Sequence, residues 1–177
     1  MFRRGLGVVA AIALLSGVVI SPAQAATRAE MREALLTRSQ INAILPANGG
    51  ELSERVATRS RASYSAWTTV GDEVMSVTDL AIAHLGGRDA RPRDVPPRFD
   101  DGWQRIRRTT DTLVQFKEEF AGGAVRVVIF RGVNAVSAVC TQVTGGSDYP
   151  VLTRTELRRC ARAVAQEQFA KLLDVVG

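Results

Sequence analysis

Residues 110–143 have the sequence TDTLVQFKEEFAGGAVRVVIFRGVNAVSAVCTQV, and this stretch decides the fold. It divides into three runs rich in β-branched and apolar residues, Thr110–Phe120, Val125–Phe130 and Ala135–Val143. In the first run, apolar or β-branched residues alternate with the polar residues Asp111, Gln115, Lys117 and Glu119. This period of two is typical of a strand with one buried face. The second run is apolar at every position except Arg126, which indicates a strand buried on both faces.

Two short connections separate these runs. The first, Ala121-Gly122-Gly123, has the backbone freedom that a turn needs. The second, Arg131-Gly132-Val133-Asn134, indicates a tight hairpin, because Gly and Asn tolerate the positive φ that such turns require. The sequence therefore predicts a three-stranded antiparallel meander.

The last predicted strand contains Cys140, one of only two cysteines in the chain. The other, Cys160, lies in a C-terminal segment whose apolar residues recur at helical spacing. These residues are Leu157, Cys160, Ala161, Val164, Ala165, Phe169, Leu172 and Val176. An apolar sheet face can therefore meet an apolar helix stripe, and we predict a Cys140–Cys160 disulfide worth about 3 kcal/mol in the chain-entropy model. The predicted fold class is α+β, an antiparallel meander packed against an N-terminal helix and a long C-terminal helix.

The predicted N-terminal helix has clear boundaries. Thr37 and Gln40 have the spacing of a capping box, and Pro46 ends the helix. The same device stands before the C-terminal helix, where Thr153 precedes Glu156 by three residues. Both helices are therefore expected to begin at a threonine cap.

Residues 51–102 are the part that the pattern specifies least. Leu52, Val56 and Ser60 fit one helical stripe, and Val74, Val77, Ala81 and Leu85 fit another, but Val77–Leu85 also suits a strand, so both interpretations stay open. From Arg88 to Gly102 the composition changes to Pro, Asp and Arg. This change predicts a loop that is either functional or mobile.

Residues 1–25 have the features of an export signal. Arg3 and Arg4 precede an apolar run, Leu6–Ile20, that is short for a membrane span, and Ala23-Gln24-Ala25 resembles a cleavage site. No cysteine lies near that site, and no later stretch is apolar for long enough to cross a bilayer. We therefore expect a single secreted domain over residues 26–177, with no lipid anchor and no transmembrane helix.

Composition and motifs exclude several classes of function. Without Arg3 and Arg4, 21 basic and 18 acidic residues leave a net charge of +3, and no basic tract with interleaved aromatic residues indicates nucleic-acid binding. Glycine-rich nucleotide motifs are absent, so no cofactor is expected. Acidic groups such as Asp72, Glu73 and Asp79, or Asp100 and Asp101, lack the spacing of known sites, so we predict no metal site.

His84 is the only histidine in the chain. Any catalysis of the Ser-His-Asp or Cys-His kind must use it, with Asp79 or Asp89 as a group that orients the ring. No G-x-S-x-G sequence is present to supply a nucleophile elbow. A single histidine beside Leu85 is also typical of a partly buried structural residue.

The best candidates for ligand binding are arginines and tryptophans. Arg154, Arg158 and Arg162 are spaced by four residues and form one stripe of the C-terminal helix. Because guanidinium groups suit carboxylates and phosphates, an anionic envelope molecule is a candidate ligand, although such a stripe can also be a plain solvated face. Trp67 and Trp103, near loops, can line a pocket or belong to the core.

The order of these features resembles a known group of proteins. An export signal, the helix segment LLTRSQINAIL (residues 35–45), an antiparallel sheet and a Cys-bearing last helix are similar to the extracellular sensor domain of actinobacterial receptor kinases (PknH-type) and its secreted relatives. The near absence of lysine among the basic residues suits a high-GC source of that kind. The resemblance implies an α+β fold with a cleft that binds a small ligand.

Three functions are consistent with these features. The preferred one is a non-enzymatic secreted binding or sensor-like domain for an anionic or amphipathic envelope molecule. The second is a small secreted hydrolase that depends on His84. The third is a structural or inhibitory domain that binds another protein, which predicts an exposed apolar patch and no pocket.

Overall fold

The structure, a computed structural model, describes residues 26–44, 54–70, 75–96, 102–118, 123–142 and 152–177. The predicted export signal (residues 1–25) and the helix stop at Pro46 lie outside these ranges. Within them the elements follow in the order α1 (Arg28–Glu33), α2 (Arg38–Ile44), β1 (Glu54–Ala57), β2 (Arg61–Val70), β3 (Met75–His84), the 3-10 helix η1 (Pro92–Asp94), β4 (Gln104–Arg108), β5 (Thr112–Lys117), β6 (Ala124–Arg131), β7 (Asn134–Gln142) and α3 (Arg154–Val176).

The described strands form one antiparallel sheet in the order β1-β2-β3-β7-β6-β5-β4. The predicted meander is confirmed as β5, β6 and β7. Arg131 pairs with Asn134 across a two-residue turn in which Gly132 has a φ of 50°, a conformation that glycine adopts without strain. Because β7 also pairs with β3, the meander and the β1–β3 strands join into a single sheet.

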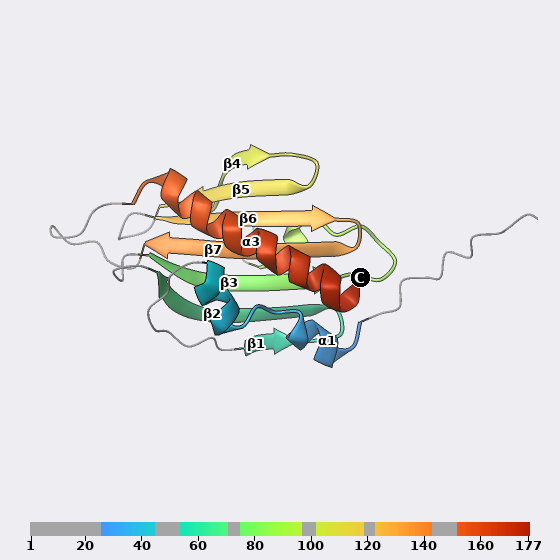
Figure 1. The fold of residues 1–177 in the computed structure, drawn as a ribbon. Helices are drawn as coiled ribbons and strands as arrows, with labels where there is room; N and C mark the ends of the chain where they lie inside the picture. The colour runs from blue at the N-terminus through green and yellow to red at the C-terminus, as the bar shows by residue number, and fades with distance from the viewer. Residues whose placement is uncertain (1–25, 45–53, 71–74, 97–101, 119–122, 143–151) are drawn as a thin grey trace, which may run out of the picture.

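Helix α3 crosses one face of this sheet diagonally (Figure 1). Its predicted apolar stripe faces the sheet: the residues from Leu157 to Leu172 in that stripe are buried, and Val176 packs at the edge of the same core. The Cys140–Cys160 disulfide is confirmed, with Cα atoms 6.2 Å apart. This bond ties α3 to β7 in the interior of the sheet.

Helices α1 and α2 lie beside α3, and α1 also contacts β1 and β2 (Figure 1). The capping box predicted for α2 is confirmed: the Gln40 N–H donates to Thr37 Oγ1 at 3.3 Å, and the Thr37 N–H donates to Gln40 Oε1 at 2.9 Å. The box before α3, Thr153 with Glu156, is also present. Helix α1 is an addition to the prediction, although Thr27 and Glu30 show the same capping signal in the sequence.

The opposite face of the sheet is covered by the chain that follows β3. Leu85, Ala90 and Val95 form a second core cluster with residues of the sheet. The side chain of Arg126 is fully buried in this layer and donates to the carbonyl oxygen of Val95 at 2.6 Å. The prediction that the second strand of the meander is buried on both faces is therefore confirmed.

Several expectations for residues 51–120 need correction. Where the structure describes residues 51–85, the helical interpretations are wrong, because β1, β2 and β3 occupy most of that stretch. The strand interpretation of Val77–Leu85 is confirmed up to His84, and Leu52 and Val74 lie outside the described residues. Gln115 is fully buried rather than solvent-facing, because it pairs with Arg126 beneath the η1 layer. The predicted loop Arg88–Gly102 contains η1, and β4, which was not predicted, extends the sheet beyond it.

Candidate functional site

A pocket of about 490 Å³ lies between the C-terminal half of α3 and the β5–β6 part of the sheet. Residues of the sheet and of the helix line it in similar numbers. They are Asp111, Thr112, Val127, Ile129, Arg131, Arg162, Gln166, Phe169, Ala170 and Leu173. This volume falls in the range of about 300–1,000 Å³ that is usual for small-molecule sites.

The pocket follows from the way in which α3 crosses the sheet. The helix begins beside β5, where Arg154 contacts Phe116, and its later turns run toward β3 (Figure 1). On its other flank, α1 and α2 fill the space between helix and sheet. Over the described residues, no equivalent element covers the flank above β5 and β6. The diagonal crossing therefore leaves a wedge open on that side.

The inner part of the pocket is apolar. Val127 and Ile129 come from β6, and Phe169 comes from α3; each of the three is at most 7% exposed. Leu173, one turn further along the helix, is 43% exposed and continues this apolar lining toward solvent. These side chains can accept the hydrocarbon part of a ligand, because each square ångström of apolar surface that is removed from water contributes about 25 cal/mol.

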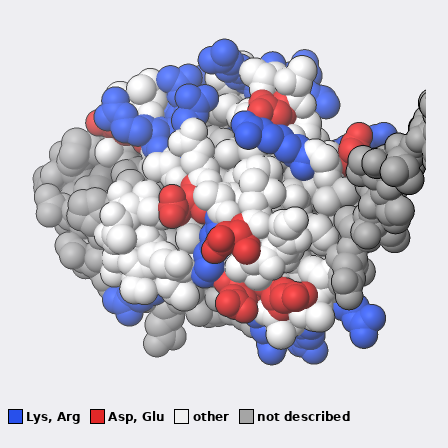
Figure 2. All heavy atoms as spheres, turned by 45° about the vertical axis from the view of Figure 1, so that its right-hand side comes forward, with Lys and Arg blue, Asp and Glu red and all other residues white. Residues whose placement is uncertain are grey.

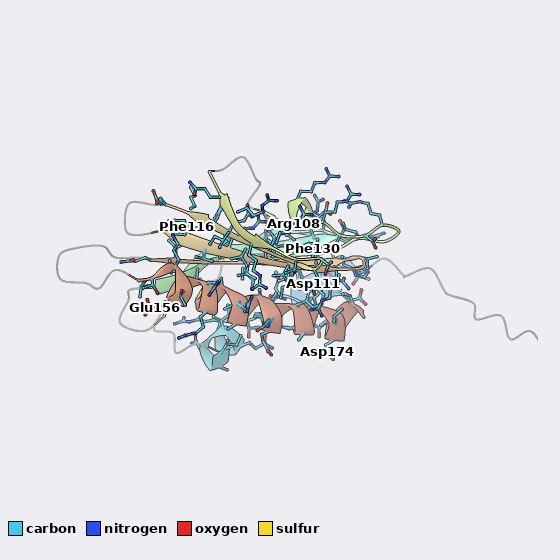
Figure 3. The ribbon with its side chains drawn as sticks, turned by 90° about the horizontal axis from the view of Figure 1, so that it is seen from above. Arg108, Asp111, Phe116, Phe130, Glu156 and Asp174 are labelled. Carbon is cyan, nitrogen blue, oxygen red and sulfur yellow. A yellow bond between two sulfur atoms is a disulfide. The ribbon has the colours of Figure 1, made fainter. Side chains whose placement is uncertain are left out.

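The rim at the sheet side is a charged pair. Arg131 Nη2 lies 2.8 Å from Asp111 Oδ2, and the guanidinium also lies over the ring of Phe169, 5.6 Å from its centroid. Hydrogen bonds from the hydroxyl of Thr109 and from Arg131 and Thr112 hold the pKa of Asp111 below its ordinary value. Asp111 is therefore an anion at neutral pH, and Figure 3 shows it between the sheet and α3.

The predicted arginine stripe lies along the same flank of α3. An α-helix turns by 100° per residue, so positions four apart differ by about 40° around its axis. The three arginines therefore stay on one side of the helix. Arg154 starts the series over the ring of Phe116, 3.9 Å from its centroid, and Arg162 ends it in the pocket lining. Arg158 lies between them and is half-buried. Arg162 makes no ion pair or side-chain hydrogen bond within the described part of the structure, so its charge is available to a ligand.

The other predicted site residues lie elsewhere. Trp67 belongs to β2, and its side chain is outside the described part of the structure. Trp103 is half-buried, directly precedes β4 and is not among the residues that line the pocket. His84 is 4% exposed and pairs through Nδ1 with Asn134 Oδ1 at 2.7 Å, so Asn134 orients the ring in place of the expected aspartates. Its Nε2 has no hydrogen-bond partner among the described residues. The ring is therefore closed off from solvent and apart from the pocket.

Two residues of the rim were not predicted as site residues. The period of two places Asp111 on the polar face of a strand, and Arg131 belongs to the predicted hairpin turn. The meander itself contains the signal that relates them: in antiparallel neighbours, the start of one strand lies beside the end of the next, and Thr112 pairs with Ile129. Asp111 and Arg131 lie just outside the pair of Thr112 and Ile129, so they are expected to form an ion pair.

No group of three or more metal-binding side chains occurs among the described residues. In the same part of the chain, no helix is both long and apolar enough to span a membrane. The disulfide is consistent with an oxidising environment. In comparisons with known proteins, no family model matches the chain and no curated protein has significant sequence similarity to it.

Proposed function

We propose that this chain is a secreted, non-enzymatic domain that binds an anionic amphipathic small molecule of the cell envelope in the pocket between α3 and β6. One observation carries the proposal: an apolar interior is combined with a cationic rim in which Arg162 has no partner among the described residues. The export signal in the sequence and the disulfide support the extracellular location. A sensor-like role agrees with the resemblance carried by residues 35–45.

The chemistry of the lining indicates how such a ligand would lie. Its hydrocarbon part would contact Val127, Ile129 and Leu173, and its anionic group would lie at the rim beside Arg162. Guanidinium groups bind carboxylates and phosphates through paired N–H donors. Either head group would satisfy the rim, so charge and hydrocarbon length set the affinity.

The test is isothermal titration calorimetry of residues 26–177 with two amphiphiles of equal chain length, decanoate and decyltrimethylammonium. We expect decanoate to bind and the cation to bind at least about fivefold more weakly, a difference of ~1 kcal/mol from one partly exposed charge contact. Arg162→Gln is expected to remove most of that difference. Arg38→Gln, an exposed arginine of α2 outside the pocket, is the matched control and should leave both affinities unchanged.

Two results would overturn the proposal. One is an absence of binding for both amphiphiles. The other is decanoate binding that Arg162→Gln and Arg38→Gln weaken equally, because such binding would depend only on net charge.

A further inference from the structure

Strand β4 differs from the rest of the sheet in its exposure. All five of its residues, Gln104–Arg108, are exposed, and it is the edge strand of the described sheet. Its sequence, QRIRR, contains three arginines around one isoleucine. Figure 2 shows Lys and Arg side chains gathered along the upper rim of the molecule, the height at which β4 lies in Figure 1.

Among the residues that the structure describes, no acidic side chain pairs with the three arginines of β4. Arg105, Arg107 and Arg108 make no ion pair or side-chain hydrogen bond within the described ranges. The register places Arg107 opposite Val114, whose side chain belongs to the core beneath α3, and Arg108 opposite Leu113, which belongs to the second core. Arg107 and Arg108 therefore lie on opposite faces of the sheet, and Figure 3 shows Arg108 on the side away from α3.

Ile106 stands between these charges. The register shifts between Arg105 and Arg107, so Ile106 has no cross-strand partner, and its side chain is 44% exposed. Charged residues and bulges are common at sheet edges because they prevent pairing with another chain. Protection of the edge explains the arginines and the bulge, but it does not explain a large apolar side chain at an exposed position.

We propose that the β4 edge is a contact surface for an anionic lipid bilayer, with the arginines at the head groups and Ile106 in the interface. Basic residues around an exposed apolar side chain are typical of proteins that bind such surfaces. A bilayer is broad enough to reach arginines on both faces of the sheet edge. An acidic peptide that paired with β4 would instead follow the backbone of one edge, which favours the bilayer.

The proposal concerns a surface outside the pocket and does not depend on a bound ligand. It is tested by co-sedimentation of residues 26–177 with vesicles of phosphatidylcholine, alone or with about one third phosphatidylglycerol. We expect binding to the mixed vesicles only. It should weaken as salt rises from 0.1 M to 1 M, since the screening length then falls from about 10 Å to about 3 Å.

Two triple variants with the same change in net charge distinguish vesicle binding through the β4 edge from binding that depends only on the net charge of the protein. Each arginine near an anionic surface contributes about fivefold, so replacing Arg105, Arg107 and Arg108 by Gln should lower vesicle binding by about 100-fold. The control replaces three exposed arginines of α1, α2 and the β1–β2 turn, namely Arg28, Arg38 and Arg59, by Gln. It should change binding by less than about threefold, because charges beyond the screening length from the surface are largely screened. Ile106→Ser should weaken binding several-fold without a change in salt dependence.

Three results would overturn the proposal. The first is an absence of vesicle binding, which would limit β4 to the protection of the sheet edge. The second is an equal loss of binding in the two triple variants. The third is binding to polyglutamate but not to vesicles, which would assign the surface to an acidic protein segment.

Discussion

The side-chain oxygen Oε1 of Gln168 accepts a hydrogen bond from the backbone N–H of Leu36 at 2.8 Å, across 132 positions of sequence. Its Nε2 donates to the carbonyl oxygen of Ala34, and Lys171 Nζ donates to the carbonyl oxygen of Leu35 at 2.6 Å. The connection between α1 and α2 is therefore held by side chains of α3. Gln168, Ala34 and Leu36 are all buried, so water cannot reach the backbone groups that Gln168 binds. The side chain of Gln168 therefore satisfies hydrogen-bonding groups that would otherwise have no partner.

Replacing this glutamine should cost stability. Gln168→Leu keeps a similar volume but leaves two buried backbone groups without partners, so we expect a loss of about 3 kcal/mol in the free energy of unfolding. Urea unfolding followed by circular dichroism measures it. Gln166→Leu, on the exposed pocket side of α3, is the control and should stay within about 0.5 kcal/mol of the parent. Similar losses in the two variants would show that the bridge does not hold α1 and α2.

Arg126 has the corresponding role on the other face of the sheet. It donates to Ser137 Oγ at 2.9 Å, to Gln115 Oε1 at 3.0 Å and to the Val95 carbonyl. Arg126→Met should lower stability by about 3 kcal/mol, since it removes the donors for several buried acceptors. It should also increase amide hydrogen exchange in the segment around Val95. Arg93→Met, at an exposed position of η1, should do neither.

The disulfide is expected to stabilise the fold through the unfolded state. The two cysteines are 20 positions apart, and closing a loop of this size corresponds to about 3 kcal/mol. Replacing Cys140 and Cys160 together by Ala should therefore lower the urea midpoint without a change of fold. Dithiothreitol should lower the midpoint of the parent protein and leave that of the double variant unchanged. An effect of dithiothreitol on the double variant would contradict this prediction.

Stability should depend on pH through Asp94. Its carboxylate accepts hydrogen bonds from Arg88 at 2.6 and 2.9 Å and from the Arg91 N–H at 2.8 Å, and the bonds from Arg88 contribute most to a pKa below the ordinary value. A carboxylate with a depressed pKa in the folded state stabilises the fold above its unfolded pKa of about 3.9. That stability is lost as the pH falls through the lower folded pKa.

Comparing the unfolding free energies of the parent protein and of Asp94→Asn isolates the contribution of this carboxylate from that of the other acidic groups. At about pH 6 the variant should be ~2 kcal/mol less stable than the parent protein, from the loss of hydrogen bonds to a charged group. Since the parent loses the contribution of Asp94 in acid, the difference in unfolding free energy should narrow as the pH falls below about 4. A difference in unfolding free energy that stays constant down to about pH 2 would contradict the prediction that Asp94 stabilises the fold as an anion.

Asp111 should oppose the binding of an anionic ligand. Its carboxylate engages Arg131 through Oδ2 and accepts from the Thr109 and Thr112 hydroxyls through Oδ1. Asp111→Asn keeps an oxygen for the threonines and removes the negative charge from the rim, so decanoate should bind about fivefold more tightly. Titration calorimetry measures this, with the exposed Asp174→Asn as the control. Weaker binding by Asp111→Asn would show that the carboxylate organises the rim instead.

Local patterns explain why the meander and α3 were predicted correctly. Strand periodicity, hairpin glycines and capping boxes act over a few residues, and β5–β7 and α3 contain all three signals. Strand β3 alternates less clearly, because its successive residues Leu80–Ala83 are buried against the core clusters on both faces of the sheet. Helix and strand were therefore equally consistent with residues 74–85.

The site depends on distances that no local pattern contains. The pocket exists because α3 crosses the sheet at an angle and because α1 and α2 fill only one flank. Gln115 had the polar signature of a solvent-facing residue, and only the η1 layer makes it buried. Helical spacing makes Arg162 a candidate, but Asp111 and Arg131, which line the same pocket, lie at strand ends that share no motif with the helix.

The unequal flanks of α3 separate the positions that natural selection can change freely from those that it cannot. On the flank of α1 and α2, Gln168 and Lys171 are bound to fixed backbone partners, so substitutions there are expected to destabilise the fold. On the other flank, Arg162, Gln166 and Leu173 are exposed and bear little of the packing. Under the proposed function, substitutions along that side of the helix would change which ligand binds while the scaffold stays the same.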